Sequence, residues 1–352
     1  MNKILENLFR KNSSLSWGAG ILLAIVLLSF ISVLLPETFF ENDWGALLQS
    51  PSTNHLLGTG SRGNDIAAGI ISGLKISLTV ALLSVIFATL IGLPSGLIAA
   101  TFGNKGKAGI KQLIFFFIFL VLAWFYAFYL RRFEIADASS DSFSMISEIL
   151  FSFFLFIVIL MIGYFFAAKI LSPLKNFIPV QLPIDTLLST LADIITSFPL
   201  LMIILTLTAI AKPSLWLVVV IIGCTTWTGI FRVVRSVALQ TLQLDFITAA
   251  KAMGMKTRTI ILKHVMSSVL PMLFVHLAFT FSAAIVLESA LTFLGAGLPV
   301  GTVTLGSLLS DAKSNFTAWW LVLFPGVVLF LLLLSLQLIA SGLQKKFNPR
   351  LR

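Results

Sequence analysis

The chain has 352 residues, of which 58% are hydrophobic and 11% are charged, and its mean hydropathy is +1.03. A composition this apolar excludes a soluble globular protein of this size and is typical of integral membrane proteins. The formal net charge of +10 does not indicate a nucleic-acid partner, because the basic residues follow the predicted sides of a lipid bilayer.

About eight segments of the chain are long and apolar enough to cross a bilayer. A helix rising ~1.5 Å per residue needs about 20 apolar residues to cross ~30 Å of hydrocarbon. Each segment is continuously apolar rather than alternating, which predicts helices and not barrel strands. The expected fold class is therefore all-α, a polytopic transmembrane helical bundle. The predicted spans are residues 18–35, 76–100, 112–130, 149–168, 194–211, 214–231, 267–287 and 320–339.

Lys and Arg residues are distributed unequally between the two sides of this predicted bundle. With the N-terminus inside, 18 of the 24 lie on cytoplasmic segments and six lie outside. This positive-inside pattern predicts that both termini are cytoplasmic. The N-terminal segment is similar to a secretory signal, but no small-residue cleavage site ends its apolar run, so we expect an uncleaved first span. The outer residues are Arg62, Lys75, Arg131, Arg132, Lys212 and Lys313.

Sequence motifs for catalysis, nucleotide binding and metal binding are absent. The chain contains no GxxxxGK[ST] loop, no HExxH pair and no GxSxG elbow. Cys224 is the only cysteine, and the three histidines do not have metal-ligand spacing. We therefore expect no cofactor, no metal and no enzymatic activity in this chain. Energy for uphill transport would come from a partner protein or an ion gradient, and only Asp193 and Glu288 approach the carboxylates that an ion relay needs.

The stretch DFITAAKAMGMKTRTI, residues 245–260, interrupts the apolar chain on its predicted cytoplasmic side. Asp245 is the expected N-cap of a short helix, and Gly254 ends that helix because glycine accepts a left-handed backbone. A second helix is expected to begin near Thr257 and to turn back toward the membrane. One apolar stripe recurs at i, i+3, i+4 and i+7 along the first helix. Its members are Phe246, Ala249, Ala250 and Met253.

The short helix has two interpretations that periodicity alone does not separate. Its apolar stripe fits either the lipid interface, as an amphipathic segment, or a groove on a cytoplasmic partner protein. The small side chains of Ala249 and Ala250 favour a close protein contact. The basic residues around the helix keep it on the cytoplasmic side in either case. They are Lys251, Lys256, Arg258 and Lys263.

Small and polar residues inside two predicted spans indicate helix packing. Gly92 and Gly96 form a GxxxG pattern, which allows two membrane helices to approach closely. His276 in the seventh span fits a hydrogen-bonded structural residue better than a substrate ligand.

The segment TAAKAMG followed by MKTRTIILKHV resembles the EAA loop in permease subunits of binding-protein-dependent ABC importers. In that family the short helix is the coupling helix, which inserts into a cleft of the ATP-binding subunit and passes its motion to the membrane helices. Ala249, Ala250 and Gly254 match the family pattern, while Thr248 stands where Glu is usual. The resemblance implies coupling to ATPase subunits through this helix. The residues expected to carry it are Asp245, Phe246, Ala249, Ala250, Met253 and Gly254.

Four further segments, in the family's order, resemble C-type subunits of dipeptide and oligopeptide permeases. They are PSTNHLLGTGSRGNDIAAGIISGLKISL (51–78), DIITSFPLLMI (193–203), LESALTFLGAGLPVGTVTLGSLLSDAK (287–313) and the ending FPGVVLFLLLLSLQLIASGLQKKFNPRLR. Gly60 and Asn64 depart from the family's GTDxxGRD pattern, which has an acidic and a basic residue at these positions. These departures lie on the predicted outer side, where a binding protein would dock.

The resemblance implies the inner-membrane, multi-pass permease subunit of an ATP-driven importer for dipeptides or oligopeptides. The implied partners are a second permease subunit of the B type, two ATP-binding subunits, an extracytoplasmic substrate-binding protein and the lipid bilayer. Glu288 lies in the matching LESALTFLGAG segment and is either part of an outer gate or a carboxylate among lipid headgroups. Nickel or another non-peptide solute is the alternative cargo. The rival class is a gradient-driven transporter or channel, which would need essential charges inside its spans.

Permease subunits of this family are similar to six-span bundles, whereas this chain carries an inserted two-span hairpin at residues 104–185. The expected domains are an N-terminal region, residues 1–75, and a permease core, 76–103 with 186–352, whose coupling loop is 232–266. Adding a pair of spans keeps the later segments on the family's sides of the membrane. The hairpin is rich in aromatic residues and is either a lipid-facing peripheral element or a docking surface for a further membrane partner.

Overall fold

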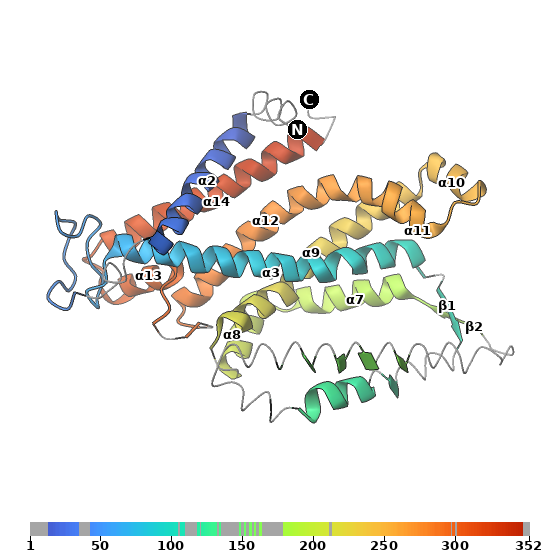
Figure 1. Cartoon of the computed structure of the whole chain (residues 1–352), viewed down its shortest axis with the longest axis horizontal. Helices are drawn as coiled ribbons and strands as arrows, with labels where there is room; N and C mark the ends of the chain where they lie inside the picture. Colours follow the sequence, from blue (N-terminus) through green and yellow to red (C-terminus); the bar gives the residue numbers. More distant parts are fainter. Residues whose placement is uncertain are drawn as a thin grey trace. The chain divides into compact units, whose positions relative to one another are not determined.

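The computed structural model divides into two compact units. The first unit comprises Met1–Thr101 with Asp185–Arg352, and the second comprises Phe102–Ile184. The described elements of the first unit are helices joined by loops and turns (Figure 1). The described residues are 13–34, 43–104, 106–109, 179–210, 213–296, 298–299 and 301–347, with short pieces between 118 and 163.

Five helices in the described portion of the chain are long and apolar enough to cross a membrane. Each overlaps a predicted span but differs from it in its bounds: the second begins at Ile66 rather than at residue 76, and the third ends at Leu242 rather than at residue 231. The predicted span at 149–168 falls largely outside the described residues, and of the span at 112–130 the structure describes 118–119 and 121–130. The five helices are α2 Ser13–Leu34, α3 Ile66–Phe102, α9 Leu215–Leu242, α12 Met266–Phe293 and α14 Trp320–Phe347.

The predicted span at residues 194–211 does not form one unbroken helix. The chain forms two helices here, α7 Ile184–Ser197 and α8 Leu200–Ile210. Pro199 separates them, because proline lacks the N–H that continues a helix and disfavours helical backbone in the residue before it. The Pro199 carbonyl oxygen instead accepts a hydrogen bond from the Met202 amide, at 2.9 Å, at the start of α8.

Helices α2 and α14 lie side by side in opposite directions (Figure 1). Glycines permit their close approach at two levels. A Cβ at Gly18 would lie 2.7 Å from the Ser335 carbonyl oxygen, and one at Gly342 would lie 2.8 Å from Leu15 Cβ. Contacts of this kind between backbones favour the association of helices in lipid.

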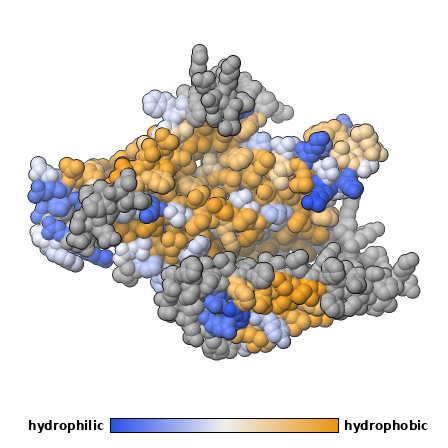
Figure 2. Space-filling view, in the orientation of Figure 1, coloured by the Kyte–Doolittle hydropathy of each residue, from blue (hydrophilic) through white to orange (hydrophobic). Residues whose placement is uncertain are grey.

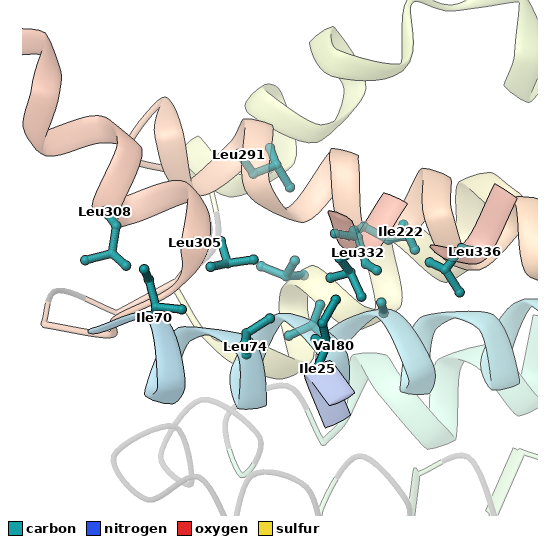
Figure 3. Close-up of a cluster of buried hydrophobic side chains, with 14 of the residues drawn as sticks. Ile25, Ile70, Leu74, Val80, Ile222, Leu291, Leu305, Leu308, Leu332 and Leu336 are labelled. Carbon is teal, nitrogen blue, oxygen red and sulfur yellow. The ribbon is translucent and has the colours of Figure 1, made fainter. Parts of the chain in front are cut away.

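Buried aliphatic side chains from the spanning helices and from the short helix α13 Leu305–Asp311 form one cluster (Figure 3). Lipid tails are as apolar as these side chains, so the cluster stabilises the bundle in a membrane through close packing rather than through transfer from water. Its labelled members in Figure 3 are Ile25, Ile70, Leu74, Val80, Ile222, Leu291, Leu305, Leu308, Leu332 and Leu336.

Helices α3 and α9 approach closely at the GxxxG pattern, as predicted. A Cβ at Gly92 would lie 2.8 Å from the Trp227 carbonyl oxygen, and one at Gly96 would lie 2.9 Å from the Phe231 carbonyl oxygen. A larger residue at either position would therefore push the two backbones apart. A second buried cluster extends from this contact and includes Ile247.

Polar residues gather at two ends of the first unit, whose helices are apolar along their length (Figure 2). At one end α9 is followed by α10 Asp245–Ala252, α11 Thr257–Ile260 and the π-helical turn Ile261–Val265, which continues into α12. At the other end lie the loop 43–65 and α13. We call these the α10 end and the α13 end.

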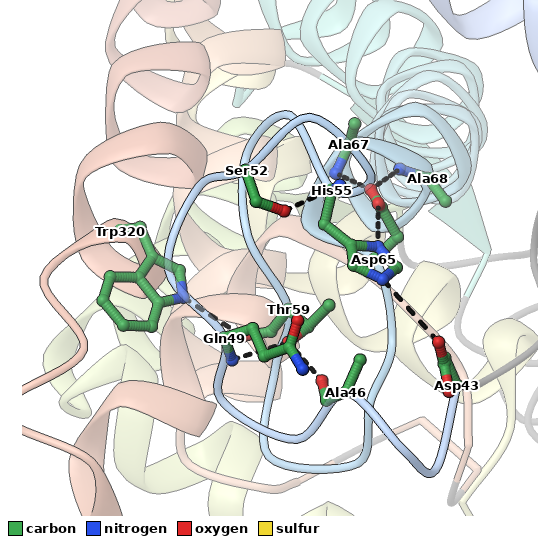
Figure 4. A network of polar contacts seen from close by, with 10 residues as sticks. All are labelled: Asp43, Ala46, Gln49, Ser52, His55, Thr59, Asp65, Ala67, Ala68 and Trp320. Carbon is green, nitrogen blue, oxygen red and sulfur yellow. Dashed lines mark hydrogen bonds and ion pairs between the residues drawn. The ribbon is translucent and has the colours of Figure 1, made fainter.

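A polar network ties the loop 43–65 to the helices at the α13 end (Figure 4). Thr59 is fully buried, and its carbonyl oxygen accepts a hydrogen bond from Trp320 Nε1 at 3.1 Å. His55 Nδ1 lies 2.9 Å from Asp65 Oδ2. Asp65 also accepts hydrogen bonds from amides in the first turn of α3. The loop is therefore held against both α3 and α14.

The second unit contains a two-stranded antiparallel sheet among its described residues, which the all-α prediction did not include. The strands are β1 Gly106–Gly109 and β2 Pro179–Leu182, with Gly106 opposite Leu182. Because β1 follows α3 and β2 precedes α7 in the chain, the sheet brings the two ends of the inserted segment together.

Candidate functional site

Leu244, and not Asp245, is the N-cap of α10. Helix α9 ends in hydrogen bonds from the Gln243 and Leu244 amides, so the extended cap conformation, φ −71° and ψ 143°, falls on Leu244. Asp245 is the first helical residue, and its prediction as the cap is wrong. Its carboxylate lies in the first turn, where a negative charge interacts favourably with the helix dipole.

Gly254 ends α10 in the left-handed conformation that the sequence predicts, with φ +80°. The Met255 amide donates to the Ala250 carbonyl oxygen and the Gly254 amide to that of Lys251, both at 3.0 Å. This pair of hydrogen bonds is the Schellman motif, which satisfies the last carbonyl groups of a helix. The following helix begins at Thr257, also as predicted. The turn therefore fixes α10 against α11.

The structure places the predicted apolar stripe on two faces of α10. Phe246 is 50% exposed and Met253 is 78% exposed, and Ala249 between them is also exposed. Ala250 is only 4% exposed and points inward together with Ile247, which is fully buried. We call Phe246, Ala249 and Met253 the exposed face of α10. The predicted stripe did not include Ile247, although its i, i+3 spacing to Ala250 indicates a buried face.

Aromatic and charged neighbours surround the exposed face of α10. The Phe246 ring lies edge-on to the His264 ring, with 5.7 Å between the ring centroids, so it is anchored to the turn before α12. Gly254 is exposed, and no atom lies within 4 Å of where its Cβ would be. Four exposed basic residues lie close by in the sequence. They are Lys251, Lys256, Arg258 and Lys263.

Two ion pairs join α7 to the half of α9 that leads into α10. Arg235 binds both carboxylate oxygens of Asp185, with Nη2 2.5 Å from Oδ2. Arg232 Nη2 lies 2.8 Å from Asp193 Oδ1. Asp193, a candidate for an ion relay in the sequence, is therefore paired with an arginine. The sequence did not show this pairing, because about 40 residues separate the partners and no local period connects them.

Glu288 is fully buried near the C-terminal end of α12. Its Oε2 accepts a hydrogen bond from Ser77 Oγ of α3 at 2.7 Å, and Thr292 Oγ1 lies 3.4 Å from its Oε1. Buried carboxylates require such partners, because desolvation without hydrogen bonds is costly. The structure thus places this residue between helices rather than at an exposed surface.

Helix α13 sits tightly against α3 and α12 beside Glu288. Thr304 caps α13 and donates to Thr292 Oγ1 at 3.0 Å. A Cβ at Gly73 would lie 3.0 Å from the Thr304 carbonyl carbon, and one at Gly306 would overlap Thr292 Oγ1. We call this contact, formed by Gly73, Thr292, Thr304 and Gly306, the α13 seat.

His276 packs against Gly229 of α9, where an added Cβ would lie 3.0 Å from the imidazole Nε2. Cys224 is exposed on α9. No group of three His, Cys, Asp or Glu side chains is placed to hold a metal ion within the portion of the chain that the structure describes.

Comparison with known proteins gives two kinds of similarity. A family model described as binding-protein-dependent transport system inner membrane component matches residues 181–352. A protein of Brucella suis biovar 1, provisionally named a peptide transport system permease protein, is 32% identical over 169 residues. These residues are 48% of this chain and 57% of the relative, so the match spans little more than half of that protein.

Two other relatives match along nearly the whole chain. The oligopeptide transport system permease protein OppC of Mycobacterium tuberculosis is 25% identical over 350 residues, which are 99% of this chain and 94% of the relative. The dipeptide transport system permease protein DppC of Alkalihalophilus pseudofirmus is 26% identical over 345 residues, which are 97% and 88% of the two chains.

Proposed function

Because residues 181–352 match the family of binding-protein-dependent transport system inner membrane components, we propose that the chain belongs to this family and is a permease subunit of an ATP-driven importer for dipeptides or oligopeptides. It is a multi-pass protein of the inner membrane. Its similarity to OppC and DppC along nearly the whole chain supports a peptide as the cargo.

The proposed arrangement has about eight spans, with both termini and the α10 end in the cytoplasm. The 18 basic residues on the proposed cytoplasmic segments support this orientation against six on the other side. The α13 end then faces outward, toward an extracytoplasmic substrate-binding protein. Residues 104–185 are proposed as an inserted hairpin in the permease core 76–103 with 186–352, after the N-terminal region of residues 1–75.

The observation that carries the proposal is the exposed face of α10. Phe246, Ala249 and Met253 present an apolar surface between the N-cap residue Leu244 and a Schellman turn. Clustered exposed apolar side chains are typical of a surface that a partner covers. We assign that partner as one of two ATP-binding subunits, the other of which would engage a second permease subunit of the B type.

The proposed mechanism transmits the closure of the ATP-binding subunits along the first unit. Ile247 fixes α10 to the buried cluster beneath it, so a push on the exposed face moves α9 and α12 together with α10. The Asp185–Arg235 and Asp193–Arg232 ion pairs link α7 to α9, so the two helices would move together. Helix α12 then leads from the α10 end to Glu288 and the α13 seat, where an outer gate would open and close.

The proposal predicts that Ala249→Glu abolishes coupling, because a charge placed on the exposed face of α10 would be buried in the cleft of the ATP-binding subunit. Tagged protein would be extracted in mild detergent and its partners identified by mass spectrometry. We expect wild type to bring down ATP-binding subunits and the variant to lose them, with peptide uptake reduced at least tenfold and membrane insertion unchanged.

Thr248→Glu is the matched control for this experiment. It adds the same charge one residue earlier, on an exposed position where the family's EAA pattern carries Glu. We expect this variant to keep its partners and its uptake. Retention of the ATP-binding subunits and normal uptake by Ala249→Glu would refute the coupling role of α10. Uptake that stops with an ionophore but continues without ATP would refute the ATP-driven mechanism.

A further inference from the structure

A cavity of about 430 Å³ lies beside α13. The described residues that line it come from the loop 43–65, the end of α12, the connection between α12 and α13, and α13 itself. Its volume lies within the range of about 300–1,000 Å³ that is usual for small-molecule sites. Its polar side chains include Arg62, Asn64, Thr292, Ser310 and Asp311.

Arg62 and Asp311 give this cavity two opposite charges. No ion pair within 4.0 Å joins these two residues to each other among the described salt bridges, although both line the same space. Burial raises the pKa of the Asp311 carboxyl, and the positive charge of Arg62 lowers it. The two groups therefore interact electrostatically across the cavity without direct contact. A ligand with one positive and one negative group would complement both.

Asn64 adds a polar atom that lacks a partner. Its Oδ1 is buried and accepts no hydrogen bond within the described structure, an arrangement that is rare because an unsatisfied buried acceptor is costly. Asn64 is also one of the positions at which the sequence departs from the family pattern. This oxygen lies beside Gly60, where an added Cβ would overlap it, so the unpaired acceptor faces the loop 43–65 and not the cavity.

We propose that the cavity binds a short peptide with free ends, with Arg62 contacting the peptide carboxylate and Asp311 the peptide ammonium group. This proposal rests on the proposed function, and it adds a substrate subsite in the permease itself. An arginine is suited to a carboxylate because its planar guanidinium group donates two parallel hydrogen bonds.

The position of the cavity connects this subsite to the outer gate. Thr292 lines the cavity and also belongs to the α13 seat, where it contacts both Thr304 and Glu288. A peptide in the cavity would therefore lie one side chain away from the contacts that hold α13 against α12. Peptide binding and opening of the gate would therefore both change the contacts of the Thr292 hydroxyl group.

The test measures binding of radiolabelled L-alanyl-L-alanine to the assembled importer in lipid nanodiscs, without binding protein and without ATP. The same measurement uses the peptide with an acetylated amino end or an amidated carboxyl end. We expect each blocked end to weaken binding about tenfold or more, because each removes a charge-assisted contact. Equal binding of free and blocked peptides would overturn the proposal.

Variants of the assembled importer locate the site. Arg62→Gln and Asp311→Asn should each weaken binding of the free peptide at least tenfold. Amidation of the carboxyl end should then cause no further loss of binding in Arg62→Gln. Acetylation of the amino end should cause no further loss in Asp311→Asn. Arg62→Lys should retain part of the affinity. Lys75→Gln, which removes an exposed charge of α3 outside the cavity, should bind as wild type does.

Two further outcomes separate this proposal from the proposed function. Wild-type importer that transports peptide with its binding protein, yet binds none without it, would overturn the subsite while leaving the function intact. If wild type binds no peptide and Arg62→Gln no longer docks the binding protein, the proposal would be overturned. The cavity would then receive side chains of the binding protein instead of a peptide. An assembly that hydrolyses ATP but imports no peptide would refute the proposed function, and the subsite with it.

Discussion

Asp311 brings a carboxylate into the wall of the cavity at the expense of folding stability. Burial raises its pKa and Arg62 lowers it, with a net rise above the ordinary value for Asp. A carboxyl group whose pKa is higher in the folded state binds its proton more tightly there than in the unfolded chain. The free energy of unfolding therefore falls as the pH rises through the ordinary Asp range up to the raised pKa.

Asp311→Asn is accordingly expected to be more stable than wild type at neutral pH, because it removes the desolvated charge. The gain should disappear at acidic pH, where wild-type Asp311 is protonated. Arg62→Gln should lower the stability at neutral pH, because it removes the attraction that offsets burial. Thermal unfolding of purified protein across this pH range checks both signs. A stability difference between Asp311→Asn and wild type that grows toward low pH would contradict the assignment.

The two neighbouring alanines of α10, Ala249 and Ala250, lie on different faces of the helix. Ala249 is exposed, so its substitution tests a contact with a partner, whereas Ala250 is 4% exposed and its substitution disturbs the packing of α10 against the first unit. A charged residue at Ala250 would thus confound loss of coupling with misfolding. Ala249 is the position at which the two effects separate.

At the scale of elements, α13 is a short helix that is held in place by close contacts with α3 and α12. It has only seven residues, and its position depends on a capping box and on glycines that let it touch α3 and α12. The hydrogen bonds among Thr304, Thr292 and Glu288 lie in the same place. The α13 seat is therefore sensitive to any added side-chain volume.

Gly306→Ala is expected to destabilise the protein by about 1–3 kcal/mol, the usual cost of overpacking a closely packed contact. The added methyl group would overlap Thr292 Oγ1 and the Ser289 carbonyl oxygen. Gly326→Ala in α14 is the matched control, because no atom lies within 4 Å of its added Cβ. We expect the control to unfold at the wild-type temperature or slightly above it. Equal unfolding temperatures for the two variants would show that the seat is not tightly packed.

At the scale of the whole molecule, the proposed mechanism requires the α10 end and the α13 end to lie on opposite sides of the membrane. The buried clusters of the first unit connect these ends, from Ile247 at one to Leu305 and Leu308 at the other. Because packed helices transmit displacement with little compression, a push at α10 can reach α13.

Cysteine labelling checks this orientation, since Cys224 is the only cysteine and Cys224→Ser provides a background without thiols. In that background, Thr257→Cys should react with a membrane-impermeant maleimide only in inverted vesicles. Asn54→Cys should react only in right-side-out vesicles. Both residues are exposed in the structure. Labelling of both from the same side would refute the topology and, with it, the path from ATPase to gate.

The sequence by itself determined the membrane class, five of the helices that the structure describes and the turn at Gly254. These follow from local properties, namely the length of apolar runs and the backbone freedom of glycine. Pro199 also indicated a helix break in the sequence, but the span prediction did not include it because the segment is apolar on both sides of the proline. The family resemblance likewise rested on short segments in order.

Only the tertiary structure decided which residues meet across the chain. It turned Ala250 inward, paired Asp193 with Arg232, placed Ser77 against Glu288 at a separation of 211 residues, and put Arg62 and Asp311 around one cavity. Hydropathy and periodicity describe one helix at a time, so they specify that a face is buried without specifying its partner. The partner depends on how closely helices approach, which side-chain volumes and backbone contacts set once the whole bundle has formed.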